Sequence, residues 1–288
     1  MRLALGTVQF GVDYGIANRG GKVAPKEIFR ILERAAAAGV DTLDTAVAYG
    51  ESETVLGKVG VAGWRLVTKL PELPEDCANV ETWVFDQMSA SRARLDVETV
   101  DAVMLHRPAQ LHGPRGDELL QALYALRRTG LAAKVGVSIY APDELGPLFE
   151  LADFDIVQAP LNILDRRLVD SGWAARLDES GVELHARSVF LQGLLLMAPD
   201  ARPASFAPWT SIWTHWNQWL EANSLTPLEA CLRYVLSCKA VDRAVVGLDN
   251  LAQLDEILHG AVGDMPDPPT WPEPVAPALI DPSAWASL

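Results

Sequence analysis

The sequence contains few cysteines and no arrangement that would join them. Cys77, Cys231 and Cys238 are the three cysteines among 288 residues, and none belongs to a Cys-x-x-Cys pair. Cys231 and Cys238 lie seven residues apart on a predicted helix, where they would share a buried apolar face. Metal ligation needs ligands that are grouped more closely. We therefore expect reduced thiols with a structural role, in a cytoplasmic protein.

Long apolar runs and basic clusters are also missing. No stretch approaches the roughly 20 apolar residues of a membrane-spanning helix, and the N-terminal sequence has the pattern of a strand instead of a signal peptide. The formal net charge is −14 and the pI about 4.7. Because phosphate binding needs clustered Lys and Arg, we expect neither nucleic acid nor membrane as a partner.

Two further absences concern cofactors. No Gly-x-Gly-x-x-Gly sequence follows a predicted strand, so the dinucleotide-binding fingerprint of an open α/β sheet is missing. His112, His185, His215 and His259 are scattered and have no neighbours at metal-ligand spacing. We therefore expect no structural metal.

A strand–loop–helix pattern is present instead, and it repeats eight times. The predicted strands cover residues 2–7, 40–46, 64–70, 99–106, 133–140, 155–162, 182–190 and 242–248. The predicted helices cover residues 25–39, 51–59, 81–95, 117–130, 143–152, 168–181, 227–238 and 250–261. Eight such units favour an α/β protein of the closed (β/α)8 type, the TIM barrel, over an open doubly wound sheet. We expect residues 1–264 to form this barrel as a single domain.

Two segments depart from the repeat. A long loop after strand 7, residues 192–225, carries apolar residues spaced by three or four, which predicts one face of a helix: Trp209, Ile212, Trp213, Trp216 and Trp219. This helix would either pack on the barrel or form a lid over the site. The proline-rich C-terminal tail, residues 265–288, would pack on the barrel through Trp271 and Trp285, or else be disordered.

Four polar residues stand at the ends of predicted strands or beside them. Asp44 and Lys69 lie near the ends of the second and third strands, Tyr49 follows the second, and His106 ends the fourth. In a (β/α)8 barrel the carboxyl ends of the strands meet at one face, so these residues would converge. A carboxylate, a phenol, an ammonium and an imidazole can together deliver a proton to a carbonyl oxygen.

Each member of this tetrad would have its own part. Tyr49, with an ordinary pKa of about 10, is a poor acid alone, and we expect the Lys69 ammonium to lower that pKa. Asp44 would keep Lys69 charged and oriented, and a neutral His106 would donate a hydrogen bond to the substrate oxygen. Taken singly, the four residues also fit a strand cap, a loop aromatic, a surface charge and a core histidine. Their joint placement favours function.

The segment "GVDTLDTAVAYGESETVLG", residues 39–57, closely resembles the signature of the aldo-keto reductase family, and the resemblance extends over nearly the whole chain. It implies a (β/α)8 barrel that binds NADP or NAD without a Rossmann fold. The family's catalytic residues would fall on Asp44, Tyr49, Lys69 and His106. "GVSIY", "VQAPLN", "RSVFLQGLL" and "VVGLDNLAQLDEIL" resemble its nucleotide-binding segments. The implied cofactor-binding residues are Gly6, Thr7, Ser138, Gln158, Arg187, Ser188, Phe190, Gly247, Asp249 and Gln253.

The chain departs from the family pattern at several of these positions. Ile139 replaces an Asn that contacts the carboxamide, and Arg187 replaces a Tyr that stacks on the nicotinamide. Gln253 stands where many members have an Arg for the 2′-phosphate, Ile257 replaces an adenine-contacting Asn, and Asp249 would repel a phosphate. These changes weaken the NADPH anchor, so NADH becomes plausible, and Arg187 would compensate as a stacking cation or a pyrophosphate contact.

The main hypothesis is therefore an NAD(P)H-dependent oxidoreductase that reduces an aldehyde, ketone or sugar carbonyl, or oxidises the alcohol, with Tyr49 as general acid. Tryptophans of the segment after strand 7, together with Tyr14, would line an aromatic pocket for this small-molecule carbonyl substrate. An alternative is a nicotinamide-nucleotide-binding redox sensor with little turnover. A third, a Schiff-base enzyme that uses Lys69, is weaker because an Asp44 partner would hold the lysine charged.

Overall fold

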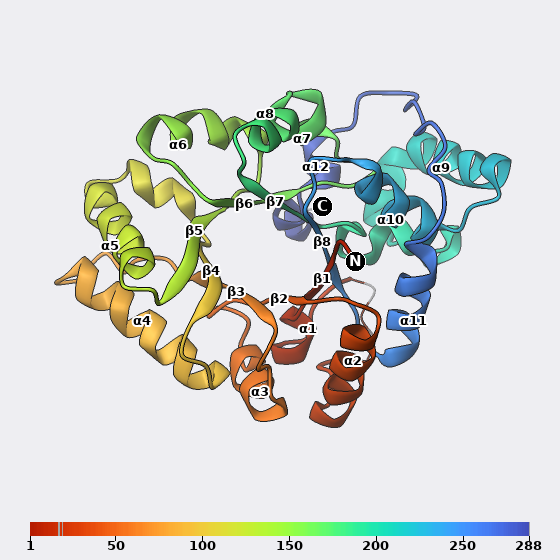
Figure 1. The fold of residues 1–288 in the computed structure, drawn as a ribbon. Coiled ribbons are helices and arrows are strands. Elements are labelled where there is room, and N and C mark those ends of the chain that lie inside the picture. Colours follow the sequence, from red (N-terminus) through yellow and green to blue (C-terminus); the bar gives the residue numbers. More distant parts are fainter. Residues whose placement is uncertain (17, 19, 288) are drawn as a thin grey trace.

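Eight parallel strands pair in sequence order, and β8 pairs back with β1 to close a barrel (Figure 1). The computed structural model describes residues 1–16, 18 and 20–287. The strands are β1 Leu3–Gly6, β2 Thr42–Asp44, β3 Arg65–Leu70, β4 Val100–Leu105, β5 Ala132–Ser138, β6 Ile156–Pro160, β7 Glu183–Arg187 and β8 Arg243–Gly247. The predicted (β/α)8 fold is confirmed, and the strands lie inside their predicted ranges except β5, which begins one residue earlier than predicted.

Helices surround this barrel as an outer ring. They are α1 Val8–Gly11, α2 Pro25–Ala37, α3 Ser52–Val59, α4 Val80–Leu95, α5 Gly116–Arg128, α6 Leu145–Leu151, α7 Arg167–Asp170, α8 Trp173–Glu179, α9 Thr210–Asn223, α10 Pro227–Ser237, α11 Leu251–Gly260 and α12 Pro277–Ile280. Short 3₁₀ helices cover Pro108–His112, Pro142–Glu144, Leu191–Leu196, Pro199–Ala201, Ala204–Trp209 and Pro282–Ser287. No helix in the described part of the chain is long and apolar enough to cross a membrane.

Local sequence explains where these helices begin and which face they bury. Helix α2 has Pro25 at its start, where the missing N–H costs nothing, and its buried residues recur at helical spacing. Helix α10 begins with a capping box, in which Thr226 and Glu229 satisfy each other's backbone N–H groups. The apolar faces meet the barrel, so the strands are buried on both sides.

The prediction was wrong in detail at the sixth helix. The expected single helix over residues 168–181 is two helices, α7 and α8. Gly172 separates them with φ of 78°, a left-handed conformation that a helix interior does not allow. Sequence periodicity also missed α1, which is only four residues long. The expectation that Cys238 lies on a buried helix face was wrong, because this residue lies beyond the end of α10 and is only half-buried.

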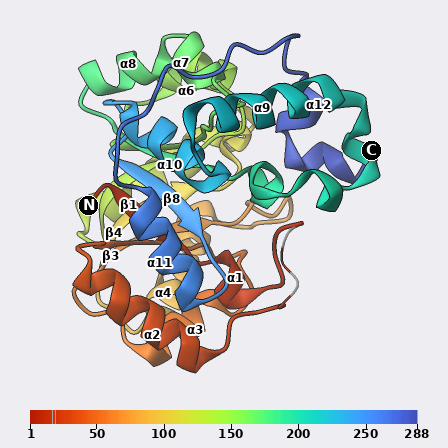
Figure 2. The same cartoon turned by 90° about the vertical axis from the view of Figure 1, so that its right-hand side faces the viewer.

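The segment after β7 and the C-terminal tail pack against each other. Helix α9 buries Ile212, Trp213 and Trp216, and the indole of Trp219 donates to the carbonyl of Asp267 in the tail at 3.2 Å. Further along the tail, the Trp285 ring meets Phe206 edge-on at 5.0 Å. Figure 2 shows α9, α12 and the C-terminus together, on the side of the barrel opposite to the N-terminus.

Candidate active site

The carboxyl ends of neighbouring strands hold the four residues of the predicted tetrad. Asp44 is the last residue of β2, Lys69 lies in β3, and His106 directly follows β4. Tyr49 lies in the turn between β2 and α3, and its ring lies edge-on to the His106 ring at 5.8 Å. The structure therefore brings all four together.

Asp44 and Lys69 form a buried ion pair. The Lys69 Nζ donates to both carboxylate oxygens of Asp44, at 2.8 and 2.7 Å, and to the carbonyl of Thr45 at 3.1 Å. The Lys69 side chain is fully buried. Burial is the largest single effect and opposes its charge, but Asp44 and Tyr49 together outweigh burial and raise the pKa of Lys69. A Schiff-base role needs a free amine, so this geometry argues against it.

Tyr49 faces the ammonium of this pair. The Lys69 Nζ lies 5.1 Å from the centroid of the Tyr49 ring. The expected effect of Lys69, which lowers the pKa of Tyr49, is present but is outweighed. Burial dominates and raises the pKa of Tyr49, although Lys69 acts in the opposite direction. The phenol therefore keeps its proton at neutral pH and is available as a proton donor.

His106 is neutral at this site. Burial, reinforced by the positive charge of Lys69, lowers the pKa of His106 to about 4. A neutral imidazole has one N–H, which it can donate to a carbonyl oxygen without holding a charge there. Tyr49 and His106 thus offer two hydrogen-bond donors to one wall of a cavity.

Gln158 and Ser138 extend the tetrad across the barrel. The Gln158 Nε2 donates to Asp44 Oδ2 at 2.7 Å, and its Oε1 accepts from Ser138 Oγ at 3.3 Å. The Thr7 hydroxyl donates to the backbone carbonyl of Asp44 at 2.9 Å. The resemblance assigned these residues to the nucleotide alone. Their hydrogen bonds show that they also fix the carboxylate that orients Lys69.

Arg187 and Tyr140 line the same cavity as Tyr49 and His106. The Arg187 guanidinium donates to the carbonyl of Ile139 at 2.9 Å and to Ser188 Oγ at 3.0 Å, and lies 4.8 Å from the centroid of the Tyr140 ring. The sequence analysis did not single out Tyr140. The residue follows β5 just as His106 follows β4, so its position at a strand end was the available signal.

These residues line a cavity of about 540 Å³ at the C-terminal end of the barrel. The cavity reaches from Tyr49 and His106 to the start of α11. It contains all ten residues predicted to bind the nucleotide: Gly6, Thr7, Ser138, Gln158, Arg187, Ser188, Phe190, Gly247, Asp249 and Gln253. Their role in binding stays a prediction.

The wall of this cavity differs from the expected one. The predicted Tyr14 lines it, and its hydroxyl accepts a hydrogen bond from Gln192 at 3.1 Å. Of the segment after β7, Gln192, Gly193 and Leu196 line it, but the tryptophans of α9 do not, so the lid hypothesis is wrong for these tryptophans. The tail takes their place, with Asp281, Pro282 and Ser283.

The far end of the cavity, at the start of α11, is acidic and already hydrogen-bonded. Asp249 and Glu256 both line it. Gln253 accepts from the backbone N–H of Asp249 at 2.7 Å instead of reaching into the cavity as an anchor. The Gln253 N–H donates to Asn250, and the Leu251 N–H donates to Glu27, each at 2.9 Å. Two N–H groups of the first helical turn are thus occupied.

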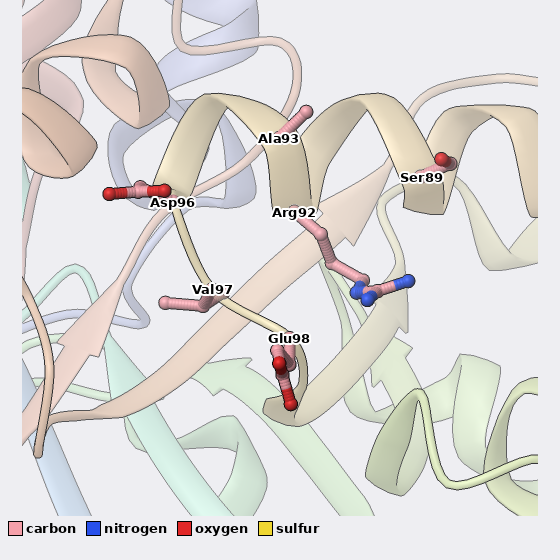
Figure 3. A pocket seen from close by; sticks show the side chains of 6 residues that line it. All are labelled: Ser89, Arg92, Ala93, Asp96, Val97 and Glu98. Carbon is pink, nitrogen blue, oxygen red and sulfur yellow. The ribbon is translucent and has the colours of Figure 1, made fainter.

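A second, smaller concavity of about 360 Å³ lies at the other end of the barrel, where α4 turns into β4 (Figure 3). Ser89, Arg92, Ala93, Asp96, Val97 and Glu98 line it. Arg92 and Glu98 extend to one side of the turn and Asp96 points away. None of the tetrad is near it. Across the described residues, no group of three or more His, Cys, Asp and Glu is placed to hold a metal.

Comparison with known proteins agrees with this fold. The sequence profile of the aldo/keto reductase family matches residues 2–262, so the chain belongs to this family of oxidoreductases, whose members use NAD(P)H. The uncharacterized oxidoreductase YqkF of Bacillus subtilis is 24% identical over 258 residues, which cover 80% of this chain and 81% of YqkF. Aflatoxin B1 aldehyde reductase member 2 of Rattus norvegicus is 31% identical over 121 residues, 39% of this chain and 32% of that protein.

Solved structures show the same fold. The aldo-keto reductase AKR11C1 from Bacillus halodurans, in its holo form, superposes with a TM-score of 0.73 at 19% identity. The glycerol dehydrogenase AKR11B4 from Gluconobacter oxydans superposes with a TM-score of 0.70 at 21% identity. Each comparison covers 92% of this chain and 88% of the other.

Proposed function

We propose that this chain is an NAD(P)H-dependent oxidoreductase that reduces an aldehyde, ketone or sugar carbonyl, or oxidises the corresponding alcohol. The observation that carries this proposal is the arrangement of two neutral proton donors, Tyr49 and His106, above the buried Asp44–Lys69 pair at one wall of a cavity. This arrangement suits the delivery of a proton to a carbonyl oxygen.

The residues divide the work. His106 donates a hydrogen bond to the carbonyl oxygen and orients it, while the Tyr49 phenol gives its proton to that oxygen as a hydride reaches the carbon. Reduced nucleotide supplies the hydride, and an alcohol results. Lys69 stabilises the phenolate that remains, and Asp44 keeps Lys69 protonated and in place. The reverse reaction uses the same groups, with the Tyr49 phenolate as base.

The cavity suits a nicotinamide nucleotide. Gly6 and Gly247 pair in register at the ends of β1 and β8, and both line the cavity. A Cβ atom on Gly247 would come within 2.4 Å of the Gln9 side chain. Left-handed backbone at Ser188, and again over 191–193, is typical of turns whose N–H groups bind a diphosphate.

We infer a preference for NADH over NADPH. A 2′-phosphate at the start of α11 would meet the carboxylates of Asp249 and Glu256 and a helix turn whose N–H groups are already used. Arg187 and His106 are the basic residues among those that line the cavity, and both belong to its other end. The dissociation constants of the two reduced nucleotides, measured by calorimetry, test this preference.

Replacement of Tyr49 by Phe tests the proposed chemistry. We expect Tyr49→Phe to bind NADH like the wild type and to lose at least about a hundredfold in turnover, because only the proton donor is removed. The assay is NADH oxidation across a panel of aldehydes, ketones and sugars. Full turnover by the variant would refute the role of Tyr49. Tight NADH binding by the wild type without turnover on any carbonyl would favour the redox-sensor alternative.

A further inference from the structure

One cation faces the reacting end of the cavity without a charged partner. Arg187 ends β7 and lines the cavity together with Tyr49 and His106. Its two hydrogen bonds go to neutral acceptors, the carbonyl of Ile139 and the hydroxyl of Ser188. Across the residues that the structure describes, no carboxylate forms a salt bridge with it. The guanidinium is therefore held in place while its charge stays unneutralised.

The ring of Tyr140 holds this guanidinium from a third side, at 4.8 Å from the ring centroid. A second guanidinium, that of Arg107, lies 5.2 Å from the same centroid. Arg107 is exposed and does not line the cavity. The chain thus contains two arginines on one ring, of which only Arg187 faces the site. Arg107 is a matched control for any effect of charge on Tyr140.

The proposed reaction determines where a nicotinamide ring must lie. A bound reduced nucleotide would supply hydride to a carbonyl carbon whose oxygen is held by Tyr49 and His106. Its ring would then lie beside these two side chains, in the part of the cavity that Arg187 lines. The charge of Arg187 acts on both Tyr49 and His106, whereas that of Arg107 acts on His106 and more weakly. Of the two arginines, Arg187 is therefore the one whose charge reaches a ring placed next to both side chains.

We propose that Arg187 makes this protein distinguish the two oxidation states of its nucleotide and bind the reduced form more tightly. The inference rests on the proposed function. The oxidised nicotinamide ring is positively charged and the reduced ring is neutral, whereas phosphates and adenosine are identical in both. The guanidinium repels only the oxidised ring. A tyrosine, usual at this position in the family that the sequence resembles, would attract a cationic ring instead.

Paired titrations test this proposal. The full-length protein is titrated with NADH and with NAD⁺ by calorimetry at one ionic strength, as wild type, Arg187→Met, Arg187→Lys and Arg107→Met. The measured quantity is the ratio of the NAD⁺ to the NADH dissociation constant. We expect Arg187→Met to lower this ratio about tenfold, which corresponds to about 30 mV in the potential of the bound couple. Arg187→Lys keeps the charge and Arg107→Met lies outside the cavity, so both should keep the ratio within about twofold.

An unchanged ratio in Arg187→Met would overturn the proposal, as would an equal fall in Arg187→Lys, since the charge would then not be the cause. If Arg187→Met does not fold by circular dichroism, Arg187→Gln provides a second neutral variant. Failure of the proposed function would give results that differ from failure of the Arg187 proposal. A wild type that binds neither nucleotide would refute both proposals, whereas full turnover in Tyr49→Phe would refute only the role of Tyr49.

Discussion

Strand β3 carries a cation at each end of the barrel interior, and the two have different surroundings. Arg65 begins the strand and Lys69 lies next to its end, with Val67 between them on the same face. Val67 belongs to a small buried apolar cluster inside the barrel. Lys69 has one carboxylate partner, Asp44, and lies below a cavity.

At the other end, five charged or titratable side chains form what we call the N-terminal cluster: Arg65, Asp101, Lys134, Glu183 and His185. The Arg65 guanidinium contacts Asp101 at 3.0 Å and Glu183 at 3.2 Å, and both Lys134 and His185 also contact Glu183. None of the five lines the active-site cavity. A buried ion pair alone therefore does not identify a site. The tetrad differs because neutral proton donors adjoin its pair and face a cavity.

The sharpest test of this contrast is Lys69→Met. We expect turnover to fall by about 10²–10⁴-fold, because the phenolate of Tyr49 loses its stabilising charge. Stability should also fall, by about 3–5 kcal/mol, because the Asp44 carboxylate is left buried without a counter-ion. Turnover and denaturant unfolding of the same preparation measure the two effects.

The double variant Asp44→Asn/Lys69→Met separates these effects. Removing both charges restores much of the lost stability, since no unpaired ion remains buried. Turnover should stay as low as in Lys69→Met. Recovery of turnover together with stability would mean that the pair serves the fold alone, as the N-terminal cluster does.

The converse result is expected for Glu183→Gln in the N-terminal cluster. Glu183 is nearly buried, forms salt bridges with Arg65 and Lys134 and is hydrogen-bonded to the His185 ring, so the variant should lose about 2–3 kcal/mol of unfolding free energy. Its turnover and NADH affinity should stay within about twofold of the wild type, because the cluster lies outside the cavity. A large fall in turnover at unchanged stability would contradict this division of the barrel.

Glu183 should also make the stability of the fold sensitive to acid. Burial opposes the Glu183 charge, but hydrogen bonds from His185 and Lys134 hold the pKa of Glu183 far below its ordinary value. A carboxyl group whose pKa is lower in the folded state stabilises the fold above its unfolded pKa. That contribution disappears as pH falls from about 4.5 towards the folded pKa. Unfolding curves at pH 3 and pH 7 should therefore differ less for Glu183→Gln than for the wild type.

The fold was largely predictable because each strand is a short apolar run between helices with clear start and stop signals. The helix break at Gly172 was not, since a single glycine is compatible with either a helix or a turn. Spacing in α9 predicted one apolar face but not its neighbour. Only the packed structure shows that this face meets the preceding 3₁₀ segments and the tail instead of the cavity.

The tetrad was predictable because parallel strands deliver their end residues to one face. The hydrogen bond from Gln158 to Asp44 was not, because it depends on side-chain conformations across strands that are not adjacent. The effect of Lys69 on the pKa of Tyr49 was predicted in the right direction, but the larger effect of burial was not, for a related reason. Sequence places a lysine nearby, but the depth of burial, which dominates here, is set by the whole fold.

Carbonyl reduction by the tetrad should depend little on pH, whereas an ordinary histidine would introduce a pH dependence near neutrality. Burial lowers the pKa of His106 to about 4 and raises that of Tyr49 above its ordinary value. His106 stays neutral as pH falls until about 4, and Tyr49 stays protonated as pH rises past 10. The kcat/KM for carbonyl reduction should thus be nearly flat between about pH 5 and 9. An inflection near 6.5, the ordinary histidine value, would contradict this picture.

The smallest expected effect concerns the acidic far end of the cavity. Its carboxylates lack cationic partners among the described residues, unlike those at either end of the barrel interior. Asp249 accepts from Asn18 and lies beside Gln253, both neutral. The double variant Asp249→Asn/Gln253→Arg should raise NADPH affinity by about five- to tenfold, since one repulsive charge is removed and one attractive charge is added. NADH affinity should change less than about twofold. Equal gains in affinity for both nucleotides would show that this end does not contact the 2′-position. If the wild type binds NADH and NADPH equally well, the inferred preference for NADH is wrong.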